Sequence, residues 1–266
     1  MYKRIFLSIT LLVLLTLAKA HEFWIQPTKF FYKAAEKLVL SFKVGENFMG
    51  EPWNLKKDRI ETFQLHQSTN VTNLLDSLKE GKQDNLSYTL KEEGTHMVAM
   101  QSTNAFVEMS GEDFNTYLKE DGLDDILEHR KKTNTLTAQA KEFYSRHTKL
   151  LVQVGGKRTD VSKKILGFPV EIVPEKNPYT LKIGDPIRFK ILFDGKPMFG
   201  VRTKVWNRFD NRTTIQNIYT EKDGTFEVHI SNPGPWMVSV VRMVPSKDPA
   251  AEWQSYWGSL IFGIQK

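Results

Sequence analysis

Apolar and polar residues alternate along much of this chain, a pattern that predicts β-strands. Residues 37–44 place leucine, phenylalanine and valine side chains on one face, and lysine and serine side chains opposite them. Residues 60–66, 95–101 and 143–154 alternate in a similar way. The first half of the chain is therefore expected to consist mainly of strands.

A helical pattern interrupts these strands between about residues 110 and 142. It begins with a serine suited to be an N-cap and with two acidic residues, which the positive end of a helix dipole favours. Phe114, Tyr117 and Leu118 have the spacing of one helix face, and Asp121-Gly122 breaks the run before a second helical stretch. The segment predicts two helices inserted into a β domain.

The second half returns to short strands and frequent turns, which are typical of β-sandwiches. Residues 186–194 alternate cleanly, and residues 169–178, with proline at both ends, are expected to form a hinge. The fold class predicted is mainly β, with two β-sandwich domains of the immunoglobulin or prealbumin type. The N-terminal domain is expected at residues 21–165, with the helical insert inside it, and the prealbumin-like C-terminal domain at residues 166–266.

The start of the chain has the features of a secretory signal peptide at residues 1–20. Two basic residues precede an apolar run at residues 5–18, and Ala18-Lys19-Ala20 offers small residues at the positions that a signal peptidase reads. The apolar run is too short to span a bilayer. We expect a periplasmic or secreted mature protein that begins at His21 and has no stable membrane insertion after cleavage.

The amino-acid composition and the absence of certain motifs argue against several classes of function. Outside residues 1–20 the chain has 34 basic residues (37 minus three) against 31 acidic ones, and the charges are interspersed, so a nucleic-acid partner is not expected. The chain has no cysteine, which excludes thiolate metal sites and cysteine nucleophiles. It also lacks the His-Glu-x-x-His and Gly-x-Ser-x-Gly motifs, so a non-enzymatic protein is favoured over an enzyme.

A histidine at a free N-terminus can chelate one metal ion through its α-amine and its Nδ1 atom. Amine and imidazole nitrogens suit Ni²⁺, Co²⁺ and Cu²⁺. The predicted metal ligands are His21 together with His96 and His147, which lie on predicted strands of the N-terminal domain. The cofactor expected is therefore a divalent transition metal ion.

Four segments carry a resemblance to a known family. They are His21-Glu22-Phe23-Trp24, Phe114–Arg130, Phe143-Tyr144-Ser145-Arg146 with the following Lys149-Leu150-Leu151, and Trp253-Gln254-Ser255-Tyr256-Trp257. Together they resemble the exported bacterial family known as domain of unknown function 4198. The resemblance implies a β-rich periplasmic protein associated with nickel or cobalt uptake, and His21 is the one residue whose functional role it implies.

The function predicted is that of an exported metal-binding protein that assists nickel or cobalt uptake, with a membrane metal-uptake system as its partner. One alternative is a copper protein or monooxygenase that uses His21 in a histidine brace, which requires a second histidine. Another alternative is a cell-surface adhesion or carbohydrate-binding module in which His21 has no role.

Overall fold

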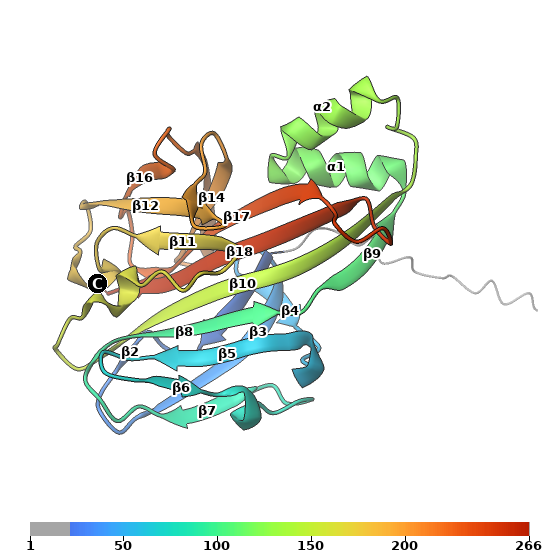
Figure 1. Cartoon of the computed structure of the whole chain (residues 1–266). Coiled ribbons are helices and arrows are strands. Elements are labelled where there is room, and N and C mark those ends of the chain that lie inside the picture. Colours follow the sequence, from blue (N-terminus) through green and yellow to red (C-terminus); the bar gives the residue numbers. More distant parts are fainter. Residues whose placement is uncertain (1–21, 266) are drawn as a thin grey trace, which may run out of the picture.

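The computed structural model describes residues 22–265, and these residues form three β-sheets and a helical hairpin (Figure 1). The first sheet has four antiparallel strands in the order β1-β3-β4, with β7 also paired to β3. Its strands are β1 (Glu22–Pro27), β3 (Lys37–Glu46), β4 (Met49–Pro52) and β7 (Leu86–Thr89).

The second sheet is central and has ten strands, in the order β15-β14-β17-β18-β10-β8-β5-β6, with β2 and β9 also paired to β10. Its strands are β2 (Phe31–Tyr32), β5 (Ile60–His66), β6 (Val71–Asn73), β8 (Gly94–Ser102), β9 (Ala105–Met109), β10 (Ala140–Val154), β14 (Arg202–Phe209), β15 (Arg212–Tyr219), β17 (Gly234–Pro245) and β18 (Trp253–Ile264). The parallel pairing of β10 with β18 joins the two halves of the chain into this one sheet.

The third sheet contains β11 (Val170–Pro174), β12 (Pro186–Phe193), β13 (Lys196–Pro197) and β16 (Thr225–His229). β11 lies inside the segment that was expected to be a hinge. Its five residues are all buried, because it pairs along its whole length with β12. Single turns of 3₁₀ helix occur at Lys57–Arg59, Leu75–Ser77, Asp160–Lys163 and Pro178–Thr180.

The central sheet separates two hydrophobic cores, because neighbouring residues of a strand point to opposite faces. Leu150 and Val152 of β10 lie in the core shared with the first sheet, whereas Leu151 lies in the core shared with the third sheet. This arrangement confirms that the chain is mainly β and built from more than one sheet. The assignment of two sandwich domains stays a prediction.

Two helices form within the predicted insert, α1 (Gly111–Asp121) and α2 (Asp124–Lys132). The side chain of Ser110 accepts a hydrogen bond from the amide of Asp113, and Gly122 ends α1 in the left-handed conformation (φ 71°). The helices pack over one end of the central sheet through a third core that includes Phe114 and Trp253 (Figure 1). Among residues 22–265, no helix is long and apolar enough to cross a membrane.

Candidate functional site

His21 lies outside the described residues, so the site is built from Glu22, the next residue of the chain. Glu22 begins β1 opposite Gly45, and its side chain is buried. Phe23 and Ile25 fill the core between the first and central sheets. The strand is fixed against the central sheet because the Ser259 hydroxyl donates to the carbonyl of Phe23 at 2.9 Å. Because neighbouring side chains of a strand point to opposite sides, Glu22 points to the other side of β1 from Phe23.

On that side Glu22 meets Lys204 of β14 and Asp121, the last residue of α1. The Lys204 Nζ atom lies 3.4 Å from Glu22 Oε1 and 2.5 Å from Asp121 Oδ1. The end of α1 is held in place by Arg202, which donates to the carbonyl of Lys119 at 2.8 Å. Strand, sheet and helix thus bring two buried carboxylates around one ammonium group.

Burial is the main influence on the titration of this cluster. It raises the pKa of Asp121 to about 6, against the lowering effect of Lys204, while the negative charge of Glu22 raises it further. Burial also raises the pKa of Glu22. For Lys204, burial lowers the pKa, but the two carboxylates more than compensate and the net pKa is raised. The lysine therefore stays charged, and the acids are costly to ionise.

A second buried carboxylate group lies beside this cluster, under α1. Glu142 Oε1 accepts hydrogen bonds from the Tyr117 hydroxyl at 3.2 Å and from the Ser255 hydroxyl. Trp257 donates to Ser255 at 3.0 Å. Burial raises the pKa of Glu142 to about 7; the two hydroxyls oppose this shift, and the charge of Asp121 adds to it.

Two carboxylate oxygens in these groups are buried without a hydrogen-bond partner among the described residues: Asp121 Oδ2 and Glu142 Oε2. Buried polar atoms in folded proteins nearly always have a partner, so such atoms call for an explanation. Three buried acids, counting Glu22, lie in this part of the molecule, whereas Lys204 pairs with two of them and the positive charge of Arg202 also acts on Asp121. The region therefore favours an additional cation or proton.

The structure does not bring His96 and His147 together. His96 pairs with Val152 and faces the first core, whereas His147 follows the alternation of Leu151 and contacts Phe168 and Tyr256 on the opposite face. Burial lowers the pKa of both histidines, that of His147 to about 4. Both rings are thus neutral at pH 7, as metal ligands must be.

Neither histidine reaches the start of β1. Lys204, Ser239, Ser259 and Thr148 form one row across the same face of the central sheet, so His147, next to Thr148, lies on the other face. His96 shares the face of Lys204 but lies four strands away, roughly 19 Å at the usual strand spacing. Among residues 22–265, no three histidine or acidic side chains converge to hold a metal ion.

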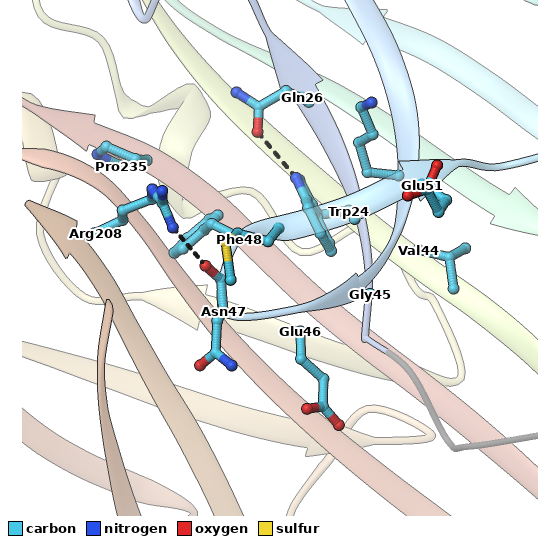
Figure 2. A pocket seen from close by; sticks show the side chains of 13 residues that line it. Trp24, Gln26, Val44, Gly45, Glu46, Asn47, Phe48, Glu51, Arg208 and Pro235 are labelled. Carbon is cyan, nitrogen blue, oxygen red and sulfur yellow. Dashed lines mark hydrogen bonds between the residues drawn. The ribbon is translucent and has the colours of Figure 1, made fainter. Parts of the chain in front are cut away.

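An open pocket with a volume of about 980 Å³ begins at the same end of β1. Gly45, the partner of Glu22, lines it, and the pocket continues past Trp24 to Arg208 of β14 and Pro235 of β17 (Figure 2). Glu46 also lines it, and its charge raises the pKa of Glu22. The buried cluster and the pocket therefore adjoin at the first residue of β1.

A family model described as "Domain of unknown function (DUF4198)" matches residues 18–244. The chain belongs to this family. Three of the four segments that carried the resemblance contribute to these buried acids and their partners: Glu22, then Tyr117 and Asp121, and finally Ser255 with Trp257. The remaining segment supplies Arg146, whose guanidinium lies 5.1 Å from the ring of Phe23 on the core side of β1. A search of curated proteins gives no match.

Solved structures of known proteins give only distant similarity. An Escherichia coli alpha-2-macroglobulin activated by porcine elastase matches over 91% of this chain and 20% of its own length, with 9% identity and a TM-score of 0.21. Three N-terminal domains of the bacteriophage RB49 Hoc protein match over 92% and 71%, with 8% identity and a TM-score of 0.22. The D00-D0 domain of intimin matches over 90% and 98%, with 11% identity and a TM-score of 0.18.

Sequence reasoning did not single out Asp121, Glu142 or Lys204. In the sequence, Asp121 forms part of the pair that breaks the helical run. The available signal was indirect: Asp121 lies within one of the family segments, and Glu142 directly precedes another.

Proposed function

We propose that this protein is an exported transition-metal-binding protein, built from two β-sandwich domains, that passes nickel or cobalt to a membrane uptake system. Cleavage after Ala20 would leave the α-amine and imidazole of His21 covalently next to Glu22. The observation that supports this site best is Asp121, whose buried Oδ2 atom has no hydrogen-bond partner among the described residues and whose Oδ1 atom shares Lys204 with Glu22.

The electrostatic environment supports a cation at this place. Glu22 and Asp121 are buried and share Lys204 as counter-charge, and the buried Glu142 has no ion-pair partner among the described residues, so an added positive charge is attracted strongly in a medium of low dielectric constant. Nitrogen and carboxylate ligands together suit Ni²⁺ and Co²⁺. His96 and His147, the other predicted ligands, lie elsewhere in the fold. We therefore propose the carboxylate of Asp121 as the ligand that binds the metal ion together with His21.

The copper-brace alternative finds less support. A histidine brace requires a second imidazole beside the terminal one, and the two other predicted ligands, His96 and His147, lie on other parts of the central sheet. The metal-carrier proposal needs only nitrogen atoms from His21 and one carboxylate.

The test uses exported protein with its natural N-terminus, verified by mass analysis to begin at His21. Calorimetry with Ni²⁺, Co²⁺ and Cu²⁺ is compared for the native protein, the N-acetylated protein and Asp121→Asn, with Asp160→Asn as the control because that side chain is 86% exposed. We expect acetylation to weaken binding at least about 100-fold and Asp121→Asn about 10-fold. Binding should strengthen from pH 6 to pH 8, since protons compete for the amine with a reference pKa of about 7.7–8.0.

Equal affinity in the native and acetylated proteins would exclude His21 as a ligand. Absence of metal binding at micromolar concentrations would favour the adhesion or carbohydrate-binding alternative. A mature N-terminus beyond His21 would remove the basis of the proposal.

A further inference from the structure

The central sheet ends in β15, a strand of eight mostly exposed residues that pairs only with β14 among the described strands. Strand edges in globular proteins are usually protected by short length, by proline or by charged side chains. β6, at the other end of the central sheet, has three residues, and the outer strands β4 and β13 of the other two sheets each contain a proline. Residues 213–219 contain neither a proline nor a charged side chain. The outer edge of β15 is therefore an unprotected template for another strand.

The hydrogen bonds between β14 and β15 show which backbone groups face this edge. In an antiparallel pair, alternate residues of a strand bond to the neighbouring strand, and the residues between them point their amides and carbonyls away from it. The Thr203 hydroxyl donates to the carbonyl of Ile218 at 2.8 Å, and the amide of Thr220 donates to the carbonyl of Val201 at 3.1 Å. Even-numbered residues of β15 thus bond towards β14. The outward backbone groups belong to the four residues between them, Thr213, Ile215, Asn217 and Tyr219.

We propose that β15 pairs antiparallel with β15 of a second copy of this chain, about a two-fold axis at Gln216. The axis must fall on a residue, because residues directly opposite each other point to the same face of the joined sheet. A centre at Gln216 places Ile215 opposite Asn217 of the second copy, and Thr213 opposite Tyr219. Every outward amide and carbonyl then has a partner, which gives about eight hydrogen bonds between the copies. The two central sheets become one continuous sheet.

Backbone pairing selects this register over its neighbours. A centre at Ile215 would place Tyr219 opposite Asn211, which lies in the hairpin turn in a left-handed conformation (φ 58°). A centre at Asn217 would place Thr213 opposite Glu221, beyond the end of the strand. Either shift leaves outward backbone groups at one end of β15 without a strand partner.

The side chains at this edge also suit a second copy as the partner. Ile215 and Tyr219 are 42% and 53% exposed, and the pairing makes the two Ile215 side chains diagonal neighbours on one face of the joined sheet. Each end of the paired strands brings together two acids and two bases, so the charges balance between the copies: Glu221 and Lys222 of one copy, with Asp210 and Arg212 of the other. One strand from each copy buries a small area, so we expect a reversible dimer with a dissociation constant of roughly 1–100 μM.

Sedimentation velocity of the exported protein, from about 1 to about 500 μM and without added metal, measures the dimer. Gln216→Lys places two like charges directly opposite each other at the axis and should weaken the dimer at least 10-fold. Gln216→Thr is the matched control and should leave the dissociation constant within about 2-fold. Because Gln216 is exposed, neither change should alter the thermal unfolding of the monomer, measured at about 1 μM.

Single cysteines test the register directly, because the chain has none of its own. Gln216→Cys places two sulfur atoms across the axis at the Cα separation of a non-hydrogen-bonded pair, about 4.5 Å, which a disulfide can bridge. Thr214→Cys is the control on the same face of the same strand, and its two copies would lie about 14 Å apart at the usual rise of a strand. Under mild oxidation we expect Gln216→Cys to form a disulfide-linked dimer at least 10-fold faster than Thr214→Cys.

A protein that stays monomeric up to about 500 μM would overturn the proposal. A dimer that Gln216→Lys leaves intact, or equal rates of crosslinking in the two cysteine variants, would place the contact on another surface and would also overturn it. Crosslinking of Gln216→Cys to a different exported protein, and not to itself, would assign this edge to another strand partner and reject self-pairing.

Discussion

Replacement of Glu142 by glutamine isolates the energetic cost of one buried acid. Glu142 is 2% exposed, and its Oε1 atom accepts hydrogen bonds from Tyr117 and Ser255. Glutamine keeps the shape of the protonated acid and a carbonyl oxygen for these two donors, but it cannot ionise. Its amide group takes the place of the Oε2 atom, which has no hydrogen-bond partner among the described residues.

The magnitude follows from the pKa shift. Burial raises the pKa of Glu142 from 4.5 to about 7. A raised carboxyl pKa means that the folded state binds the proton more tightly than the unfolded state, so the stabilisation is complete below pH 4.5 and is lost as pH rises through 7. At about 1.4 kcal/mol for each pH unit, the ionised side chain costs roughly 3 kcal/mol above pH 7.

Urea unfolding followed by tryptophan fluorescence at pH 4.5, 6 and 8 measures this effect. We expect Glu142→Gln to be more stable than the native protein by up to about 3 kcal/mol at pH 8, and close to it at pH 4.5. Glu108→Gln, which removes a partly exposed partner of Lys141, should change stability by less than about 1 kcal/mol at every pH. An unchanged pH slope in Glu142→Gln, or lower stability at pH 8, would refute the reasoning.

Two further substitutions test the packing around the site. Lys204→Met removes the counter-charge of two buried carboxylates and should destabilise the protein by about 3–5 kcal/mol at pH 8. The loss of stability should be smaller at pH 5, because Asp121 is protonated there. Urea unfolding at both pH values measures the difference. Gly50→Ala should cost about 1–3 kcal/mol in thermal unfolding, because a Cβ atom there would lie 2.6 Å from Trp24, whereas the control Gly156→Ala meets no atom within 4 Å.

The sequence pattern predicted the secondary structure well where the period was clear. Both helices lie inside the expected insert, and the strands at residues 37–46, 60–66 and 94–102 fall where alternation placed them. β15 was not foreseen: it is an edge strand with mostly exposed side chains, so burial imposes no alternation on its sequence. The parallel pairing of β10 with β18 could not be predicted from the local sequence pattern either, because it joins segments about a hundred residues apart.

The candidate site was harder to predict than the fold. Alternation within β8 puts His96 on the same side as Val98 and Met100, which face the first core. Alternation alone does not tell whether His147, on another strand of the same sheet, faces the same core. A sheet that separates two cores sends adjacent residues of β10 into different environments. The acids of the cluster come from a strand start, a helix end and a long central strand, and only the tertiary fold brings these three together.

Two explanations of the buried pair Glu22 and Asp121, a structural ammonium group or a metal ion as their partner, predict different pH dependences of stability. If the α-ammonium of His21 were itself the counter-charge of Glu22 and Asp121, its pKa would be raised, and the mature protein would gain stability below about pH 8 and lose it above. If the cluster serves a metal ion, the amine must lose its proton, so the stabilisation by Ni²⁺ grows as pH rises. The two dependences have opposite signs. Thermal unfolding of the mature protein from pH 6 to 9, with and without Ni²⁺, therefore distinguishes a structural N-terminus from a metal ligand, and a nickel-induced shift that shrinks with rising pH would count against the metal.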